Sequence, residues 1–265
     1  MRPLDIGFLV IGNEILQGFT TDTNSTYLSR NLTSIGHHVV RIVTIGDDVT
    51  AIVKHLRAML RSELDVVFVC GGLGATPDDV TMEAVGKALG VPLIVHPTAR
   101  AWVQARVRAL HAEGRILTDH MDEPHLRMAT VPKGAIVLHN KAGTAPGTVI
   151  KIPSKKKGDR SGTVIVLPGV PKELRYLYSH EIEGKVISPS DQRPYYEELK
   201  VNIAESTMHE CLKWFYNEFP SVYLGSYPQD DRTVILRVSG KKAQVKASVA
   251  RLRVELKGLA GHHTV

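Results

Sequence analysis

Segments typical of buried strands alternate with segments typical of helices along residues 4–89, and this alternation constrains the fold more than any other feature. Each strand-like run is short and nearly continuously apolar, which suits a strand covered on both faces. The order implies right-handed crossover connections, so we predict an α/β fold with a mostly parallel sheet in three layers. The expected strands cover residues 4–11, 39–45 and 65–70, and the expected helices cover residues 24–35, 52–60 and 77–89.

A polar, turn-rich stretch at residues 188–194 is the best position for a linker. The segment after it ends in a helix with one apolar face, and it predicts a second, smaller α+β domain. We therefore expect domains over residues 1–187 and 190–265. The other expected elements are a helix over 98–131 with breaks at Gly114 and Pro124, a strand at 136–138, a hairpin of 148–152 and 163–167, a helix at 171–183, strands at 195–203, 221–227 and 233–238, and a helix at 205–219.

Composition excludes several classes of protein. Hydrophobic residues make up 43% and charged residues 23% of the chain, which excludes a disordered, collagen-like or membrane-spanning protein. Cys70 and Cys211 are far apart and form no CxxC motif, so a disulfide framework is not expected. The N-terminus shows no signal-peptide pattern, and no apolar run approaches the ~18 residues of a membrane helix. We therefore expect a cytoplasmic protein without a membrane partner.

The net charge of +6, from 33 Lys and Arg against 27 Asp and Glu, is concentrated in one segment. Residues 151–160 contain five basic residues and one acidic residue, so four of the six net charges lie in one predicted hairpin tip. We interpret this segment as a solvated turn and not as a polyanion-binding surface.

The second domain offers little sign of nucleic-acid binding. Residues 258–261 have the letters of a GxxG loop, but they lie at the end of the final helix, where such a loop does not belong. Trp214, Phe215 and Tyr216 lie on a helix, where core packing is the default interpretation. Because no exposed aromatic-plus-basic pattern is evident, we do not expect nucleic acid as a partner.

A glycine-rich loop directly follows the third expected strand. Gly71, Gly72 and Gly74 allow a tight turn and close backbone approach to a ligand, and the next helix supplies free N–H groups. That combination suits a phosphate, although the spacing is neither GxGxxG nor a Walker A motif. The same glycine pattern is equally well explained by a structural turn that packs against the sheet and binds no ligand.

Carboxylates follow the same strand ends. Asp78 and Asp79 lie in the glycine loop, Asp47 and Asp48 follow the second strand, and Glu14 follows the first. Carboxyl ends of parallel strands meet at one edge of a sheet, so we expect these groups to gather there. They would repel a bare phosphate, whereas Mg²⁺ typically bridges one or two carboxylates and substrate phosphates. Taken alone, Asp47 and Asp48 are better explained as a turn before a helix capped at Thr50.

Six motifs occur in order along the first domain. They are Gly12–Gly18, Asp22–Asn24, Gly46–Asp48, Gly71–Ala84, Gly143–Gly147 and Pro168–Glu173. Together they resemble the molybdopterin-binding-like domain of the CinA (competence/damage-inducible protein) family, which also occurs in the MogA and MoaB molybdenum-cofactor proteins and in eukaryotic FAD synthase. Residues 190–265 are similar to the small KH-like domain that follows it in CinA.

Two departures from the related proteins matter. Full-length bacterial CinA proteins carry a further amidohydrolase domain that deamidates nicotinamide mononucleotide; this chain ends before it, so that activity is not carried over. In MogA and MoaB the loop reads closer to Gly-Gly-Thr-Gly followed by Arg-Asp, whereas Leu73 and Asp78 stand here in place of the Thr and the Arg. The loss of that cation favours the CinA-type branch, for which the resemblance implies metal-dependent hydrolysis of a diphosphate such as ADP-ribose or FAD.

These inferences assign roles to specific residues. Glu14 and Asp79 are the catalytic candidates, with Glu14 orienting or deprotonating the attacking water. Asp48, Asp78 and Asp79 are the expected ligands of Mg²⁺, Mn²⁺ or Co²⁺, with K⁺ as a further ion to test. The substrate-binding candidates are Gly71, Gly72, Gly74, Thr76, Asn140, Lys141, Gly143, Thr144, Pro168 and Gly169.

A second function stays open alongside the pyrophosphatase. A pterin-binding or adenylyl-transferring protein of molybdenum-cofactor synthesis would use the same pocket with different chemistry. In both cases the expected partner is a small nucleotide or pterin. We also expect a homo-oligomer, because both related branches form them.

Overall fold

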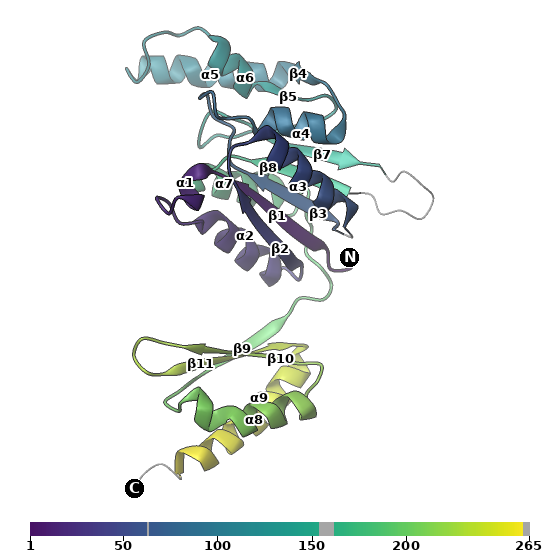
Figure 1. The fold of residues 1–265 in the computed structure, drawn as a ribbon, viewed down its shortest axis with the longest axis vertical. Coiled ribbons are helices and arrows are strands. Elements are labelled where there is room, and N and C mark those ends of the chain that lie inside the picture. The colour runs from purple at the N-terminus through teal and green to yellow at the C-terminus, as the bar shows by residue number, and fades with distance from the viewer. Residues whose placement is uncertain (63, 154–161, 262–265) are drawn as a thin grey trace. The chain divides into compact units, whose positions relative to one another are not determined.

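The computed structural model describes residues 1–62, 64–153 and 162–261, and it divides into two compact units (Figure 1). The first unit is Met1–Asp191 and the second is Gln192–Val265. Most of the charged hairpin tip, residues 154–161, lies outside the described residues. Each unit is treated by itself below.

A six-stranded sheet forms the centre of the first unit. Its first four strands are parallel, and the last two run antiparallel to their neighbours, which confirms the expected mostly parallel α/β sheet. Sequential strands are not all adjacent, because β8 pairs directly with β3 through the register of Phe68 with Ile165. The order is β2 (His38–Ile45), β1 (Asp5–Ile11), β3 (Val66–Cys70), β8 (Gly162–Leu167), β7 (Gly147–Ile152) and β6 (Ile136–Leu138).

Helices cover both faces of this sheet and complete three layers (Figure 1). On one face, α2 (Thr23–Ser34) and α7 (Pro171–Leu177) pack on Phe8 and Phe68, whose rings meet edge to face at 5.7 Å. On the other face lie α3 (Val49–Arg61) and α4 (Thr81–Leu89). Because both faces of the central strands β1 and β3 are covered, the groups near them that can meet a ligand lie at the strand ends.

A separate substructure precedes the last strands of the sheet. It consists of the two-stranded sheet of β4 (Leu93–Val95) and β5 (Thr130–Pro132), with α5 (Pro97–Ala112) and α6 (Glu123–Met128). The expected helix over 98–131, with breaks at Gly114 and Pro124, is therefore wrong at its end, where β5 begins at Thr130. Pro124 occupies the first turn of α6 and does not interrupt a helix, as expected for a residue whose missing N–H costs nothing there.

The loop after β3 is longer than expected, because α4 begins at Thr81 and not at Pro77. The short helix α1 (Asn13–Leu16), which follows β1, was not expected from the sequence. A wider turn, η1 (Tyr178–Ile182), continues α7.

The second unit is an antiparallel sheet of three strands, in the order β10 (Tyr223–Pro228), β11 (Val234–Gly240) and β9 (Tyr195–Val201). Helices α8 (Glu205–Glu218) and α9 (Lys242–Gly261) pack on one face of it (Figure 1). The core between them includes Phe215, Leu236 and Leu252, all fully buried. This architecture confirms the expected small α+β domain. No helix in the described part of either unit is both long and apolar enough to cross a membrane.

Candidate functional site

The glycine loop between β3 and α4 is held tightly against the end of β1. Gly71 has φ +108°, and a Cβ atom on it would lie 2.0 Å from the carbonyl oxygen of Ile11. Gly72 also has positive φ, and its missing Cβ leaves room for the Thr81 hydroxyl, which donates to the carbonyl of Gly71 at 2.8 Å. Both glycines are therefore required by the backbone path, independently of any ligand.

Asp79 closes the same loop from within. Its Oδ2 accepts hydrogen bonds from the Thr76 amide at 2.9 Å and from the Thr76 hydroxyl at 2.6 Å. A side chain on Gly74 would collide with this carboxylate, because its Cβ would lie 2.6 Å from Oδ2. The structure thus brings together Gly74, Thr76 and Asp79, and it leaves Oδ1 of Asp79 without a partner among the described residues.

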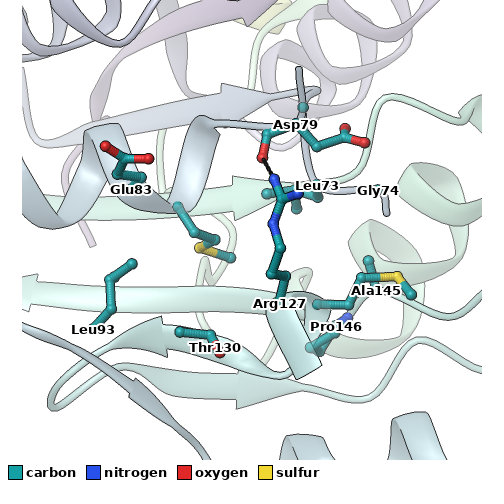
Figure 2. A pocket seen from close by; sticks show the side chains of 12 residues that line it. Leu73, Gly74, Asp79, Glu83, Leu93, Arg127, Thr130, Ala145 and Pro146 are labelled. Carbon is teal, nitrogen blue, oxygen red and sulfur yellow. Dashed lines mark hydrogen bonds between the residues drawn. The ribbon is translucent and has the colours of Figure 1, made fainter. Parts of the chain in front are cut away.

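Arg127 provides a cation in this site that the sequence did not indicate. It comes from α6, and its Nη2 donates to the main-chain carbonyls of Asp79 at 3.1 Å and Thr76 at 3.3 Å. Figure 2 shows its side chain crossing the pocket toward the main chain of Asp79, while the Asp79 carboxylate points aside. The Nε and Nη1 groups of Arg127 have no partner within the described residues, so they can bind an anion.

The pocket around Arg127 has a volume of about 380 Å³. Its walls come from the glycine loop, α4, the β4–β5 substructure and the loop before β7 (Figure 2). Of the predicted residues it contains Gly72, Gly74 and Asp79. The lining residues are Gly72, Leu73, Gly74, Asp79, Met82, Glu83, Leu93, Arg127, Met128, Thr130, Ala145 and Pro146.

Asp47, and not Asp48, is the carboxylate next to the glycine loop. Its Oδ2 accepts from the Asn13 amide at 2.8 Å, and its Oδ1 lies 3.6 Å from the Cβ position of Gly72. Partial burial raises the pKa of Asp47, and the nearby charges of Glu14, Asp78 and Asp79 add to the rise. The Asp48 carboxylate instead caps α3, accepting from the Ala51 amide at 2.7 Å, in the place expected for Thr50.

The other predicted carboxylates are more exposed. Glu14 lies in α1, and its carboxylate folds back over Gly12, where a Cβ atom would lie 2.6 Å from Oε1. Asp78 is exposed, and a hydrogen bond with the Thr76 side chain lowers the pKa of its carboxyl group.

The carboxylates near the glycine loop are suitable ligands for a hard divalent cation, but they do not form a complete metal site. In the part of the chain that the structure describes, no three His, Cys, Asp or Glu side chains converge as metal ligands. Among the described residues, Asp47 and Asp79 each keep one carboxylate oxygen without a hydrogen-bond partner at the glycine loop. Carboxylate oxygens are the ligands that Mg²⁺ takes alongside substrate phosphates. A metal bound here would therefore need oxygen ligands from the substrate or from water.

A second pocket, of about 240 Å³, contains four more of the predicted residues, Asn140, Lys141, Gly143 and Thr144. The ring of Trp102 from α5 stacks on the His139 ring at 4.2 Å with an interplanar angle of 8°. Burial lowers the pKa of His139, and the positive charge of Lys141 lowers it further, which favours the neutral imidazole. Pro146 also lines the first pocket, so the two pockets adjoin. The lining residues are Trp102, Ala105, Arg106, Ala109, His139, Asn140, Lys141, Gly143, Thr144 and Pro146.

Asn140 shapes this second pocket from behind. It is buried, and its Nδ2 donates to the carbonyl of Ala145 at 2.9 Å and to Oε2 of Glu173 at 2.5 Å. Its Oδ1 accepts from the Ala142 amide at 3.1 Å. Burial raises the pKa of Glu173, and the carboxylate fills the space over Gly143, where a Cβ atom would lie 2.0 Å from Oε2. Asn140 and Gly143 are therefore used to fold the loop, which leaves Lys141 and Thr144 to face the pocket.

Pro168 and Gly169 line neither pocket, but Gly169 lies against the glycine loop. The Asn24 amide donates to the Gly169 carbonyl at 2.7 Å, and a Cβ on Gly169 would lie 3.4 Å from the Cα of Gly71. Beside it, the buried Asn24 Oδ1 and Ser25 Oγ have no hydrogen-bond partner in the described protein. Buried polar atoms are normally satisfied, so the first turn of α2 has bonding capacity for water or a ligand.

The sequence matches a known family. Residues 7–185 match the family model described as "Probable molybdopterin binding domain", and the chain belongs to this family. It is CinA-like: a CinA-like protein of Thermosipho melanesiensis is 30% identical over 249 residues, which are 94% of this chain and 58% of that protein.

Shorter relatives match along nearly their whole length. A Pyrococcus furiosus protein is 36% identical over 249 residues, covering 89% of this chain and 95% of that protein. Among solved structures, the protein CinA of Thermoplasma acidophilum is 32% identical with a TM-score of 0.55, covering 68% of this chain and 96% of that one.

Several residues of the site were missed because they come from segments without a motif. Arg127, Trp102 and His139 lie on elements that the sequence placed only approximately. The sequence does not favour Asp47 over Asp48, since nothing local distinguishes the two residues. Glu173 stands in the last of the six motifs, and a carboxylate there opposite Gly143 was a usable signal.

Proposed function

We propose that this chain is a metal-dependent pyrophosphatase that hydrolyses a dinucleotide-like diphosphate of the ADP-ribose or FAD kind. The supporting observation is a pair of adjoining pockets of different chemistry. One is lined by the glycine loop, Arg127 and Asp79, and the other holds the stacked Trp102 and His139 with Lys141. A diphosphate with a planar base needs both kinds of surface.

In this proposal the protein groups divide the work as follows. Arg127 and the backbone of the glycine loop hold the diphosphate, and Lys141 and Thr144 hold the nucleoside part. Glu14 accepts the proton of a water whose oxygen attacks one phosphorus, and the bridging P–O bond breaks to release AMP and a second phosphate monoester. A divalent cation on Asp47 and Asp79 would neutralise charge on the diphosphate.

The test is the release of AMP from ADP-ribose and from FAD, followed by chromatography with Mg²⁺, Mn²⁺ or Co²⁺, each with and without K⁺. The expected result is AMP release that depends on a divalent cation and is lost in Asp79→Asn. Folded protein that releases no AMP under any of these conditions overturns the proposal.

One observation favours a second function. From the sequence, the aspartate at position 78, where MogA and MoaB have an arginine, argued against a pterin or adenylyl-transfer role. In the structure, Arg127 supplies a cation at the same loop from α6, which is far away in the sequence. We therefore retain the molybdenum-cofactor alternative, which the family description also suggests. Pterin fluorescence of the purified protein, or ATP consumption that depends on molybdopterin, would favour it over the pyrophosphatase.

A further inference from the structure

Within residues 192–261, helices cover only one face of the sheet of the second unit, and three tyrosines lie on the other face. Helices α8 and α9 cover the opposite face, where Leu224, Leu236 and Leu199 point into the core. Tyr196, Tyr223 and Tyr227 are 60%, 61% and 40% exposed. The strand register places them on one surface, since Tyr196 pairs across from Ser239, Ser239 from Tyr223, and Tyr227 from Ile235.

Arg237 lies at the centre of this surface and connects its two sides. Its guanidinium carbon lies 5.9 Å from the ring centre of Tyr196 and 5.4 Å from that of Tyr227. Glu198 holds the guanidinium in place, with Oε1 at 2.6 Å from Nη2 and 2.8 Å from Nε. Gly225 leaves room for Tyr227 to lean across β10, because a Cβ there would lie 2.6 Å from the tyrosine Oη. The rings are therefore held in position although they are exposed.

A basic groove adjoins this surface along the edge strand β9. It has a volume of about 470 Å³ and lies between β9 and α9. Its cations are Lys200, Arg253 and Lys257, and its one acidic residue is Glu198, which Arg237 neutralises. Lys200 pairs with Asp231 at 2.7 Å, whereas Arg253 and Lys257 have no ion-pair partner within residues 192–261. These two lie four residues apart, so they point to the same side of the helix.

The second unit as a whole is also basic. Residues 192–265 contain eleven Lys and Arg against eight Asp and Glu, so half of the net charge of +6 lies in this unit. The expectation that this segment lacks an exposed aromatic-plus-basic pattern was wrong, because it considered the helix aromatics and not the alternate strand positions.

We infer that this tyrosine face and groove bind single-stranded nucleic acid. Unpaired bases stack on exposed aromatic rings without regard to sequence, and a cationic groove alongside follows the phosphates. A duplex would hide its base faces from the tyrosines. The GxxG letters at residues 258–261 play no part, because they lie within α9. This inference does not depend on the proposed pyrophosphatase, whose pockets lie in the first unit.

The test is fluorescence anisotropy of the full chain with labelled 12-nucleotide oligouridylate and oligothymidylate, against a labelled duplex. We expect either single strand to bind at least tenfold more tightly than the duplex. The Tyr196→Ala/Tyr227→Ala variant should weaken binding at least tenfold, whereas Tyr196→Phe/Tyr227→Phe, which keeps the rings, should bind within about twofold of the wild type.

The groove is tested by Arg253→Glu/Lys257→Glu, with the exposed Lys246→Glu on the same helix as the matched control. Losing two phosphate contacts should flatten the slope of log Kd against log salt by about 1.4, at ~0.7 per contact, between about 50 and 200 mM salt. Circular dichroism checks the fold of each variant.

Three outcomes would overturn the inference. The first is no binding of either strand at low salt, and the second is equal binding of the duplex. The third is self-association that the tyrosine substitutions abolish, since that would make this face an interface between two copies of the chain. AMP release should be unchanged in all these variants.

Discussion

The two units place their exposed polar and aromatic groups differently, and the difference follows from how each sheet is covered. In the first unit both faces are buried under helices, so chemically useful groups collect where strands end, as Asp47 and Gly71 do. In the second unit the antiparallel sheet is covered on one side, and the useful groups stand on the open face itself. A site should be sought at the sheet edge in one unit and on the sheet surface in the other.

The largest effect that separates the units is expected from Phe215→Ala. Phe215 is fully buried in the core of the second unit, so its truncation should lower the free energy of unfolding by about 3–5 kcal/mol. Urea unfolding measures the loss. The neighbouring Tyr216→Ala, at an exposed position whose Oη donates to the Leu224 carbonyl, should cost only about 1 kcal/mol. AMP release that falls in parallel with Phe215→Ala would show that the units do not act separately.

The next prediction concerns Gly71→Ala, which disturbs the glycine loop of the first unit and leaves the second unit unchanged. The new Cβ meets the Ile11 carbonyl oxygen, a main-chain atom that cannot turn away, so we expect a loss of about 3 kcal/mol and of AMP release. Gly18 is the matched control, because it also has positive φ but nothing within 4 Å of its Cβ position. Gly18→Ala should cost about 1 kcal/mol. Equal losses in the two variants would mean that φ alone, and not the contact with β1, matters.

Arg127→Ala tests whether the cation in the first pocket binds substrate or only holds the loop. If it binds the diphosphate, kcat/KM for ADP-ribose should fall about 100-fold. Arg57 is the matched control, because its guanidinium likewise donates to two main-chain carbonyls, those of Ala88 at 3.1 Å and Lys87 at 2.8 Å, and it lines neither pocket. We expect both variants to lose similar amounts of stability, and only Arg127→Ala to lose activity. A comparable drop in Arg57→Ala would assign both residues a structural role.

The smallest expected effect is a pH dependence at His37 in the first unit. Its Nδ1 accepts from the Leu4 amide at 3.2 Å and its Nε2 lies 3.0 Å from the Ser188 carbonyl oxygen, an arrangement that suits the neutral ring. Burial lowers the pKa of His37 from 6.5; the charge of His38 lowers it further, and Ser188 and Asp65 oppose the shift. Because the unfolded chain binds the proton more readily, this contribution to stability is complete above the unfolded pKa and is lost as the pH falls below it.

Urea unfolding at pH 7.5 and at pH 5.5 measures this contribution. The wild type should lose more stability on acidification than His37→Gln does, whereas His111→Gln, at an exposed position of the same unit, should behave like the wild type. The same pH dependence in His37→Gln would assign the effect to other groups.

Much of the fold could be predicted from the sequence, and the reasons are local. The apolar runs and helical spacings gave the strands and helices of the central sheet and of the second unit. The glycine loop was placed correctly at a strand end. The start of α4 was missed because Asp78 and Asp79 resemble a helix N-terminus, whereas Asp79 is used to close the loop on Thr76.

The sequence by itself determined the local structure, which depends on residues that are close together along the chain. Periodicity encodes which side of a strand or helix is buried, and glycine and proline mark where the backbone must turn, so Gly71 and Gly72 could be read directly. Tertiary structure decided which distant segments meet. Arg127 reaches Asp79 across 48 positions of the chain, Trp102 stacks on His139 across 37, and Tyr196 and Tyr227 share Arg237. These contacts depend on crossover connections and strand register, which no local pattern of side chains specifies.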